Sequence, residues 1–239
     1  MNDNFELQVR WNGGKATVPE WTIQCDFDGT ISLQDVTDTL LQRHGMPGWE
    51  DLEEAWERGE IGSRECMSGQ VALLDMSVAE LREALEQVHV DPGFVRFVDH
   101  ARQLGIGVQV VSDGLDYAIQ VILAREGMGD LPIVANRLLP AGPRRWKLET
   151  PWSRPDCASA NCKCGQLAGQ QAAGKRVLYV GDGSSDFCVS GKAEHVLAKA
   201  KLLDHCRANG IVHSAFVDFD EALSRLPLIL SGQNEESTA

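Results

Sequence analysis

Trp21-Thr22-Ile23-Gln24-Cys25-Asp26-Phe27-Asp28-Gly29-Thr30 is the stretch of sequence that decides the fold. Its first five residues form a short run of β-forming side chains, and an acidic segment follows them directly. The glycine near its end favours a turn. We therefore predict a buried strand that delivers two aspartates, Asp26 and Asp28, to a loop. An acidic turn after a strand is usually a helix cap or a solvated loop, so this segment alone does not establish a function.

Two later segments repeat the arrangement of an apolar strand followed by a polar loop. Residues 106–111 lead to Ser112-Asp113-Gly114, and residues 176–180 lead to Gly181-Asp182-Gly183-Ser184-Ser185-Asp186. A weaker fourth strand is predicted over 195–198. Apolar strands that alternate with helical patterns are typical of a parallel sheet covered on both faces. We therefore predict an α/β fold with a doubly wound parallel sheet, in which ligands bind at the carboxyl ends of the strands.

The remaining segments divide the chain into a core and three additions. Residues 33–105 have apolar side chains at helical spacing, and we interpret them as a helical insertion after the first strand of the core. An alternating pattern around Asn-Gly-Gly predicts a hairpin within an N-terminal extension, 1–20. The core is then formed by 21–32 together with 106–230, and the polar tail, 231–239, is expected to be frayed.

The composition limits the classes of partner. The 22 Lys and Arg residues are outnumbered by 35 Asp and Glu residues, which gives a net charge of −13 over 239 residues. This charge would repel a phosphate backbone or an anionic membrane, so we expect neither nucleic acid nor membrane as a partner. We find no export signal and no apolar span, and the seven cysteines are scattered. We therefore expect a cytoplasmic protein with reduced thiols, and we expect it to be a monomer or a homodimer.

Four polar segments in a fixed order form a more specific pattern than any one of them. They are Asp26-Phe27-Asp28-Gly29-Thr30, Ser112, an isolated Lys163, and Gly181 to Asp186. In this combination the chain resembles the phosphatases of the haloacid dehalogenase (HAD) superfamily, from Ile23 onward. The resemblance implies a Rossmann-like core, a small helical cap formed by 33–105, and Mg²⁺-dependent hydrolysis of a small phosphomonoester.

The clustered aspartates of these segments indicate a metal ion. Asp26, Asp28 and Asp182 would repel one another strongly unless a divalent cation lay among them. Mg²⁺ binds few carboxylates together with substrate oxygens and water, which suits an open site. By the resemblance, Asp26 and Asp182 supply carboxylate ligands and Asp28 supplies its backbone carbonyl. Asp186 would orient these ligands from behind.

The resemblance also assigns the groups that act on the phosphoryl group. Asp26 attacks phosphorus and forms an aspartyl phosphate. Asp28 protonates the departing alcohol and then takes a proton from the water that hydrolyses the intermediate. The other oxygens of a metal-bound phosphoryl group need to be neutralised. The expected partners of these oxygens are Gly29, Thr30, Ser112, the backbone amides of Asp113 and Gly114, and the ammonium group of Lys163.

Lys163 lies in a cysteine-rich segment that permits a second interpretation. A lone lysine is usually a solvated surface group, but this one lies 18 residues before the Gly-Asp pair of the third loop, across one predicted helix. Cys157, Cys162 and Cys164 surround it with a C-x4-C-x-C spacing that could indicate structural zinc. This spacing lacks paired C-x2-C units and an evident fourth ligand, unless Cys188 or a histidine comes close. We prefer reduced cysteines that pack near the active-site loop.

Residues of the helical insertion would select the substrate. The insertion corresponds to the cap of the HAD branch that includes phosphoserine phosphatase. Asp35 lies nine residues after Asp26, where those enzymes carry a glutamate that binds the substrate amine. An arginine that would bind a serine carboxylate is not found in 66–74. Our candidates for substrate contacts are Asp35, Asp38 and Arg64, although charged side chains on a helix usually form its solvated face.

One family within this branch shares further segments with the chain. It comprises the 2-hydroxy-3-keto-5-methylthiopentenyl-1-phosphate phosphatases of methionine salvage. The similar segments are 62–67, the hairpin around Asn136, the cysteine-rich lysine segment and 198–203. The chain departs from this family at Ser112-Asp113-Gly114, where the family has Ser-Gly-Gly. Asn161-Cys162-Lys163 and 181–188 are also similar to the phosphocholine and phosphoethanolamine phosphatases, and a phosphatase of that kind or for phosphoserine is the alternative.

Other functional classes make different demands on the sequence. A phosphoacceptor signalling domain also combines an aspartate, a hydroxyl residue and a lysine around Mg²⁺, but it has no use for Asp28 or for a helical cap. A non-catalytic binding domain can occur on any enzyme fold. A dehalogenase of the same superfamily would not need Asp28 or the full metal site. Because all the expected catalytic positions are filled, we favour the phosphatase.

Overall fold

The core of the molecule is a sheet of seven strands, described in a computed structural model over residues 10–12, 15–17 and 20–232. The strand order is β6-β5-β4-β3-β7-β8-β9, and neighbouring strands are parallel except for the antiparallel pair β5 and β6. The predicted α/β fold with a mostly parallel sheet is therefore confirmed. The strands are β3 (Trp21–Cys25), β4 (Gly107–Leu115), β5 (Ile133–Pro140), β6 (Trp146–Glu149), β7 (Arg176–Gly181), β8 (His195–Ala198) and β9 (His213–Ala215).

β3 occupies the centre of the sheet, between β4 and β7. Its apolar side chains Ile23 and Cys25 are fully buried, as a strand covered on both faces requires. The polar Gln24 is tolerated there because its amide donates a hydrogen bond to the side chain of Gln109 on β4, over 3.2 Å. The acidic loop therefore leaves the sheet from a rigid and deeply buried position.

β4 is longer than the sequence pattern predicts. We expected the strand to end before Ser112, but it continues to Leu115 with a shift of register between Val111 and Leu115. An irregularity of this kind bends a strand and re-aims its side chains. Ser112, Asp113 and Gly114 consequently belong to the distorted end of the strand and not to a loop.

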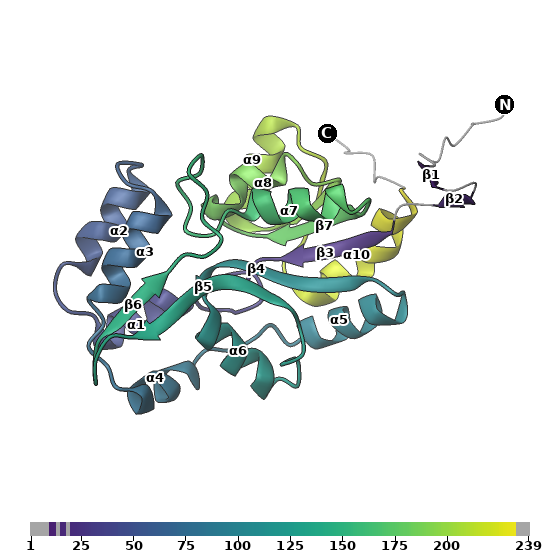
Figure 1. Cartoon of the computed structure of the whole chain (residues 1–239). Helices are drawn as coiled ribbons and strands as arrows, with labels where there is room; N and C mark the ends of the chain where they lie inside the picture. The colour runs from purple at the N-terminus through teal and green to yellow at the C-terminus, as the bar shows by residue number, and fades with distance from the viewer. Residues whose placement is uncertain (1–9, 13–14, 18–19, 233–239) are drawn as a thin grey trace.

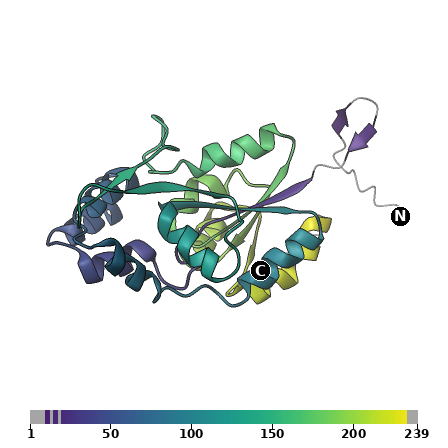
Figure 2. The ribbon, with the colours of Figure 1, turned by 60° about the horizontal axis from the view of Figure 1, so that its bottom comes forward.

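Helices cover both faces of the sheet and produce three layers (Figure 1). α7 (Lys163–Ala172), α8 (Phe187–Ser190) and α9 (Ala200–Asn209) lie on one face, and α5 (Phe94–Gln103), α6 (Asp116–Arg125) and α10 (Phe219–Ser231) lie on the other. The second face includes edge-to-face contacts of Phe94 and Phe97 with Phe219, at centroid distances of 5.0 and 5.2 Å. Figure 2 shows the same layers from a second direction.

The chain between β3 and β4 is helical, as the predicted insertion requires. It contains α1 (Val36–His44), α2 (Trp49–Glu57), α3 (Ser63–Ala72) and α4 (Val78–Leu85), followed by α5, which packs against α10 and β4. α1 to α4 gather at one end of the sheet, where α3 also contacts β6 (Figures 1 and 2). The helical cap therefore stands beside the end of the sheet to which β3 and β4 deliver their polar residues.

The described part of the N-terminal extension is a two-stranded sheet that is separate from the main one. β1 (Arg10–Asn12) and β2 (Lys15–Thr17) pair antiparallel where the N-terminal hairpin is predicted, whereas residues 1–9, 13–14 and 18–19 lie outside the described part of the chain. The predicted frayed tail falls mainly on residues 233–239, which also lie outside it. Among the helices that are described, none has the length and apolar character needed to cross a membrane.

Candidate active site

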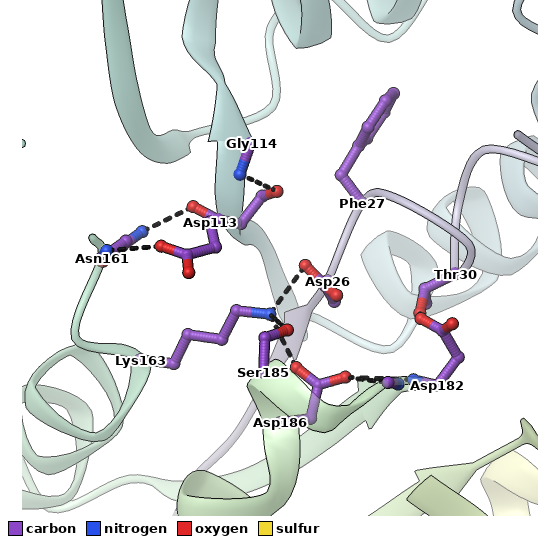
Figure 3. Close-up of polar contacts among 12 residues, drawn as sticks. Asp26, Phe27, Thr30, Asp113, Gly114, Asn161, Lys163, Asp182, Ser185 and Asp186 are labelled. Atoms are coloured by element: carbon purple, nitrogen blue, oxygen red, sulfur yellow. Dashed lines mark hydrogen bonds and ion pairs between the residues drawn. The ribbon is translucent and has the colours of Figure 1, made fainter. Parts of the chain in front are cut away.

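The four polar segments singled out in the sequence come together at the carboxyl ends of the strands (Figure 3). Asp26 directly follows β3, and its backbone amide donates to the carbonyl of Val180 on β7 over 2.9 Å. Ser112 lies in the irregular end of β4, and Lys163 is the first residue of α7. The acidic loop after β7 completes the group, in which η1 (Ser184–Asp186) forms a short 3-10 turn. The predicted convergence of these segments is what a parallel sheet produces.

Lys163 lies at the centre of this arrangement. Its Nζ atom is 2.8 Å from Oδ1 of Asp26 and 2.6 Å from Oδ1 of Asp186, and it donates to the hydroxyl of Ser185 over 3.1 Å. Only 2% of the lysine is exposed. Burial alone would lower its pKa, but the adjacent Asp186 and Asp26 carboxylates raise the pKa above its ordinary value. The side chain is therefore a permanently charged ammonium group, and not the solvated surface lysine that was the other interpretation.

Asp186 has both carboxylate oxygens engaged by the protein. Oδ1 accepts hydrogen bonds from Lys163 and, over 2.6 Å, from the hydroxyl of Tyr179. Oδ2 accepts from the backbone amides of Asp182 and Gly183, each over 3.1 Å. Because Asp186 is fully buried and so completely bonded, it is suited to hold the lysine and the acidic loop in place.

Tyr179 is a site residue that the sequence analysis missed. It is the polar ring within the apolar run Val177–Val180 of β7, and its side chain is fully buried against the site. A buried tyrosine hydroxyl almost always has a hydrogen-bond partner, so its place in this strand was a signal that could have been used.

Asp182 is positioned by the first acidic loop. The hydroxyl of Thr30 donates to Oδ1 of Asp182 over 2.5 Å. Gly29 has a φ of +71°, and a Cβ atom at that position would lie only 2.5 Å from Oδ2 of Asp182. The glycine is therefore required both for the turn and for this close approach. Thr30 was predicted to contact phosphate, but in the structure its hydroxyl contacts Asp182.

Three aspartates in the described residues lie close enough together to hold a metal ion. Asp26, Asp182 and Asp186 each offer an oxygen, and these oxygens lie within 4.8 Å of one another. Burial, together with the other aspartates, raises the pKa of Asp26 and of Asp182. Carboxylates alone are a donor set for a hard cation, and a cation would relieve this repulsion. Since Asp186 is already fully bonded, Asp26 and Asp182 are the carboxylates that fit a metal ion.

Asp28 faces the cap instead of this group. Its Oδ1 accepts a hydrogen bond from the backbone amide of Val36, at the start of α1, over 2.9 Å. Burial, and after it the charge of Asp35, raises the pKa of Asp28. A Cβ atom added at Gly114 would collide with the Asp28 carboxylate, so β4 and the first acidic loop touch at this point. The two aspartates of the first loop therefore differ in environment.

Asp113 connects three parts of the site. Its Oδ1 accepts from the backbone amide of Asn161 over 2.6 Å, and its Oδ2 accepts a short hydrogen bond from the hydroxyl of Ser63, the first residue of α3. The side chain of Asn161 in turn donates to the carbonyl of Ser112 over 2.8 Å. The aspartate that departs from the Ser-Gly-Gly pattern thus joins the end of β4 to the cap and to the segment that precedes Lys163.

A cavity of about 390 Å³ lies between the cap and the core. Asp26, Asp28, Ser112 and Asp182 contribute to its core side, together with Asp113 and Gly114. On the cap side it is lined by four carboxylates and several apolar or aromatic groups. The cap carboxylates are Asp35, Asp38, Glu53 and Glu57, and the other cap residues are Thr37, Trp56, Ser63, Cys66, Met67 and Gln70.

The cap carboxylates lack basic partners within the described part of the chain. None of them takes part in the ion pairs found there, although Glu53 accepts a hydrogen bond from the amide of Gln70 over 2.7 Å. Asp35 keeps solvent-exposed surface, but partial burial and the neighbouring Asp38 raise its pKa to about 7. Asp35 and Asp38 were predicted as cap candidates, whereas Glu53 and Glu57 were missed.

Arg64, the third cap candidate, lies elsewhere. Its guanidinium group donates to the backbone carbonyls of Arg154 over 2.8 Å and of Cys157. It is not among the residues that line the cavity. The structure therefore corrects its assignment. Arg64 attaches α3 to the loop before Lys163, and its partners are backbone carbonyl oxygens of that loop instead of an anionic group of the substrate.

Comparison with known proteins gives matches along most of the chain. The model of the haloacid dehalogenase-like hydrolase family matches residues 23–190. A 2-hydroxy-3-keto-5-methylthiopentenyl-1-phosphate phosphatase of Exiguobacterium sp. is 30% identical over 205 residues, which cover 82% of this chain and 92% of that protein. The enzyme of the same name from Brevibacillus brevis is 27% identical over 208 residues, covering 83% and 91%. A polyol phosphate phosphatase of Saccharomyces cerevisiae is 25% identical over 225 residues, covering 87% and 93%.

A solved structure shows the same fold. It is described as a phospho-aspartyl intermediate analogue of phosphoserine phosphatase, and it superposes with a TM-score of 0.68 at 21% identity. The alignment covers 86% of this chain and 98% of that one. The arrangement of the core and the cap is therefore shared over nearly the whole of the solved chain.

Proposed function

Since the chain belongs to the haloacid dehalogenase-like hydrolase family, we propose that it is a Mg²⁺-dependent phosphatase that hydrolyses a small phosphomonoester through a phosphorylated Asp26. The observation that carries this proposal is the Lys163 ammonium group, which lies 2.8 Å from Asp26 and 2.6 Å from Asp186 and holds the Asp26 carboxylate that lines the cavity between the cap and the core. A buried cation next to a carboxylate in a cavity of metabolite size is suited to phosphoryl transfer.

The donor set fits Mg²⁺. The carboxylates of Asp26 and Asp182 and the backbone carbonyl of Asp28 would hold it, and Thr30 and Gly29 keep Asp182 in position. When bound, the ion neutralises charge on the aspartates and on the phosphoryl oxygens. The lysine supplies a second positive charge, 2.8 Å from Oδ1 of Asp26.

The protein groups then divide the reaction into two displacements. The Asp26 carboxylate attacks phosphorus in line, while Lys163 keeps this carboxylate ionised and positioned. Ser112 and the amides at the end of β4 bind the phosphoryl oxygens. Asp28, held on the cap side by the amide of Val36, protonates the leaving alcohol and later takes the proton from the attacking water.

The proposal is tested by following phosphate release from a general phosphomonoester such as p-nitrophenyl phosphate. We expect turnover that needs Mg²⁺ and that disappears in Asp26→Asn, with mass spectrometry used to exclude reversion of the amide to aspartate. Asp116→Asn, outside the cavity lining, is the control and should stay active. Full activity of Asp26→Asn would contradict the role of this residue as nucleophile.

For the substrate, the relatives suggest 2-hydroxy-3-keto-5-methylthiopentenyl-1-phosphate, because the two bacterial proteins reported above carry that name. The cavity has room for a substrate of this size, and Met67 and Trp56 offer apolar contacts to a thioether. We expect kcat/KM for this ester to exceed that for p-nitrophenyl phosphate by at least about tenfold, which corresponds to one well-formed apolar contact. Equal values would remove this ester as the preferred substrate.

The cap carboxylates favour a second candidate, a phosphomonoester that carries an amine, such as phosphocholine or phosphoethanolamine. Four carboxylates without basic partners, next to Trp56, form a surface that attracts an ammonium group and repels a carboxylate. Lys201 is the one basic residue in the described lining of this cavity, and the buried Lys163 is not part of that lining.

Two isosteric esters separate these candidates by charge, phosphocholine and its neutral analogue 3,3-dimethylbutyl phosphate. The smaller, anionic phosphoglycolate adds a substrate that the cap carboxylates should repel. An amine-selective site should prefer phosphocholine to the neutral ester by about tenfold in kcat/KM, the effect of one partly solvated ion pair. Glu57→Gln should reduce this preference, whereas Glu54→Gln, on the same helix but outside the cavity lining, should not. A preference for the neutral ester would favour the methionine-salvage substrate.

A further inference from the structure

Cys164 and Cys188 form a close pair of thiols beside the catalytic groups. Their Sγ atoms are 3.4 Å apart, and both cysteines are reduced in the structure. Cys164 directly follows Lys163 in the first turn of α7, and Cys188 lies two residues after Asp186, in α8. The ion pair between Lys163 and Asp186 therefore holds the two helix starts together and brings the thiols into contact.

The surroundings of the pair make Cys164 reactive and Cys188 accessible. The hydrogen bond that Cys164 shares with Cys188, and after it a hydrogen bond with Lys192, lower the pKa of Cys164 to about 6. The position at the start of a helix acts in the same direction. Cys188 is exposed and lines a second cavity of about 630 Å³, which opens beside the first. Cys164 is half-buried beside Cys188, so a small oxidant can reach this pair without unfolding.

A zinc site made from the surrounding cysteines fits the structure less well. Cys157 and Cys162 are spatial neighbours of this pair, since Cys157, after the Cys164 hydrogen bond and burial, raises the pKa of Cys188, and Cys164, after burial, raises that of Cys162. Zinc would nevertheless need at least three thiolates that converge on one point. Among the residues that the structure describes, the group of three or more potential ligands that lies within 4.8 Å is the aspartate group of the active site. Two thiols whose sulfur atoms are 3.4 Å apart are better suited to bond with each other than to share an ion.

We propose that Cys164 and Cys188 are a redox modification site, at which a hydroperoxide converts the two thiols into a reversible intramolecular disulfide. The Cys164 thiolate attacks one oxygen of hydrogen peroxide and the O–O bond breaks. Hydroxide is the leaving group, and Cys164 becomes a sulfenic acid. Cys188 then attacks the sulfenic sulfur, the S–S bond forms, and the Cys188 proton leaves with the sulfenic hydroxyl as water. The proton that Cys164 released on becoming a thiolate neutralises the hydroxide. Two thiols together lose two electrons and two protons, and the peroxide becomes two molecules of water.

The disulfide would join the two segments that carry Lys163 and Asp186. Its formation needs the sulfur atoms to approach from 3.4 Å to about 2.05 Å, which small side-chain rotations at the helix starts can supply. The bond closes a loop across α7 and β7, so it restricts the unfolded chain. We expect the oxidised protein to keep its fold and to unfold at a temperature higher by about 5 °C.

Peptide mapping tests the proposal without any measurement of activity. Trypsin cuts after Lys163, Lys175, Arg176 and Lys192, so Cys164 lies in the peptide 164–175 and Cys188 in 177–192, one cysteine in each. Reduced full-length protein is treated with equimolar hydrogen peroxide, alkylated and digested. We expect these two peptides to be linked, and dithiothreitol to separate them. The peptide 148–163, which holds both Cys157 and Cys162, serves as the internal reference and should remain alkylated.

Serine variants test the order of the two steps. In Cys188→Ser the sulfenic acid on Cys164 cannot be resolved, so a dimedone probe should label the peptide 164–175. Cys164→Ser should give little label on 177–192, and Cys157→Ser should form the disulfide as the wild type does. Three results would overturn the proposal: no cross-link in folded wild type, a cross-link between other cysteines, or stoichiometric zinc that protects these thiols from alkylation.

Discussion

Replacement of Lys163 by methionine is the most direct test of how the site is held together. Methionine has a similar volume and stays compatible with a buried stem, but it removes the ammonium group from between Asp26 and Asp186, which lie 2.8 and 2.6 Å from it. The two carboxylates are buried, so they are left without their shared cation. Breaking a buried ion pair in this way costs about 3–5 kcal/mol. For a chain of this length the loss corresponds to a fall of about 10 °C in Tm.

Urea unfolding in the presence of a chelator measures this loss, because a bound cation would otherwise compensate in part. Lys147→Met, which removes an exposed lysine on β6, is the matched control and should change the free energy of unfolding by less than about 0.5 kcal/mol. With Mg²⁺ restored, kcat of Lys163→Met should fall by about 100-fold or more. If its stability stays within about 1 kcal/mol of the wild type and turnover persists, the lysine does not organise the site as the distances suggest.

Three further changes test other contacts. Tyr179→Phe removes a charge-assisted hydrogen bond of 2.6 Å while Asp186 keeps its other partners, so urea unfolding should show a loss of about 1–2 kcal/mol, and an unchanged midpoint would contradict the bond. Gly114→Ala places a methyl group against the Asp28 carboxylate, so steady-state kinetics should show kcat reduced by about tenfold or more. The control is Gly169→Ala on α7, where the added methyl group has no neighbour within 4 Å and the enzyme should remain fully active. Burial, and next the charge of His213, lowers the pKa of His195 to about 4. The folded state therefore binds this proton less readily than the unfolded state, so the wild type should lose stability relative to His195→Gln as the pH falls from about 6.5 towards 4. A constant difference in the free energy of unfolding across that range would refute the shift.

The core of the site follows from the sequence because each part of it is local. Asp26, Ser112 and Asp182 each come directly after an apolar run, and parallel strands bring such positions to one edge of a sheet. Lys163 was harder to assign, since nothing in its own segment shows that α7 begins at this residue and directs the side chain into the core. The resemblance to a known family supplied that assignment, and the distances to Asp26 and Asp186 agree with it.

The parts that the sequence did not reveal depend on how separate elements pack. Glu53 and Glu57 lie four residues apart on one face of α2, and only the packing of the cap shows that this face looks into the cavity. Arg64 looked like a substrate ligand by charge, yet the orientation of α3 turns it towards backbone carbonyls. The short edge strand β9 was also missed, because three partly exposed residues carry too little periodicity to indicate a strand.

Asp113 has a consequence for how this enzyme could be re-engineered. Caps are attractive modules for exchange between related enzymes, because they select the substrate while the core performs the chemistry. Here the side chain of Asp113 accepts from Ser63 in the cap and from Asn161 beside Lys163 at the same time. A transplanted cap without a hydroxyl at the start of α3 would leave one oxygen of this carboxylate without its partner and disturb the lysine segment next to it. A chimaera of this chain should therefore inherit Ser63 together with the core.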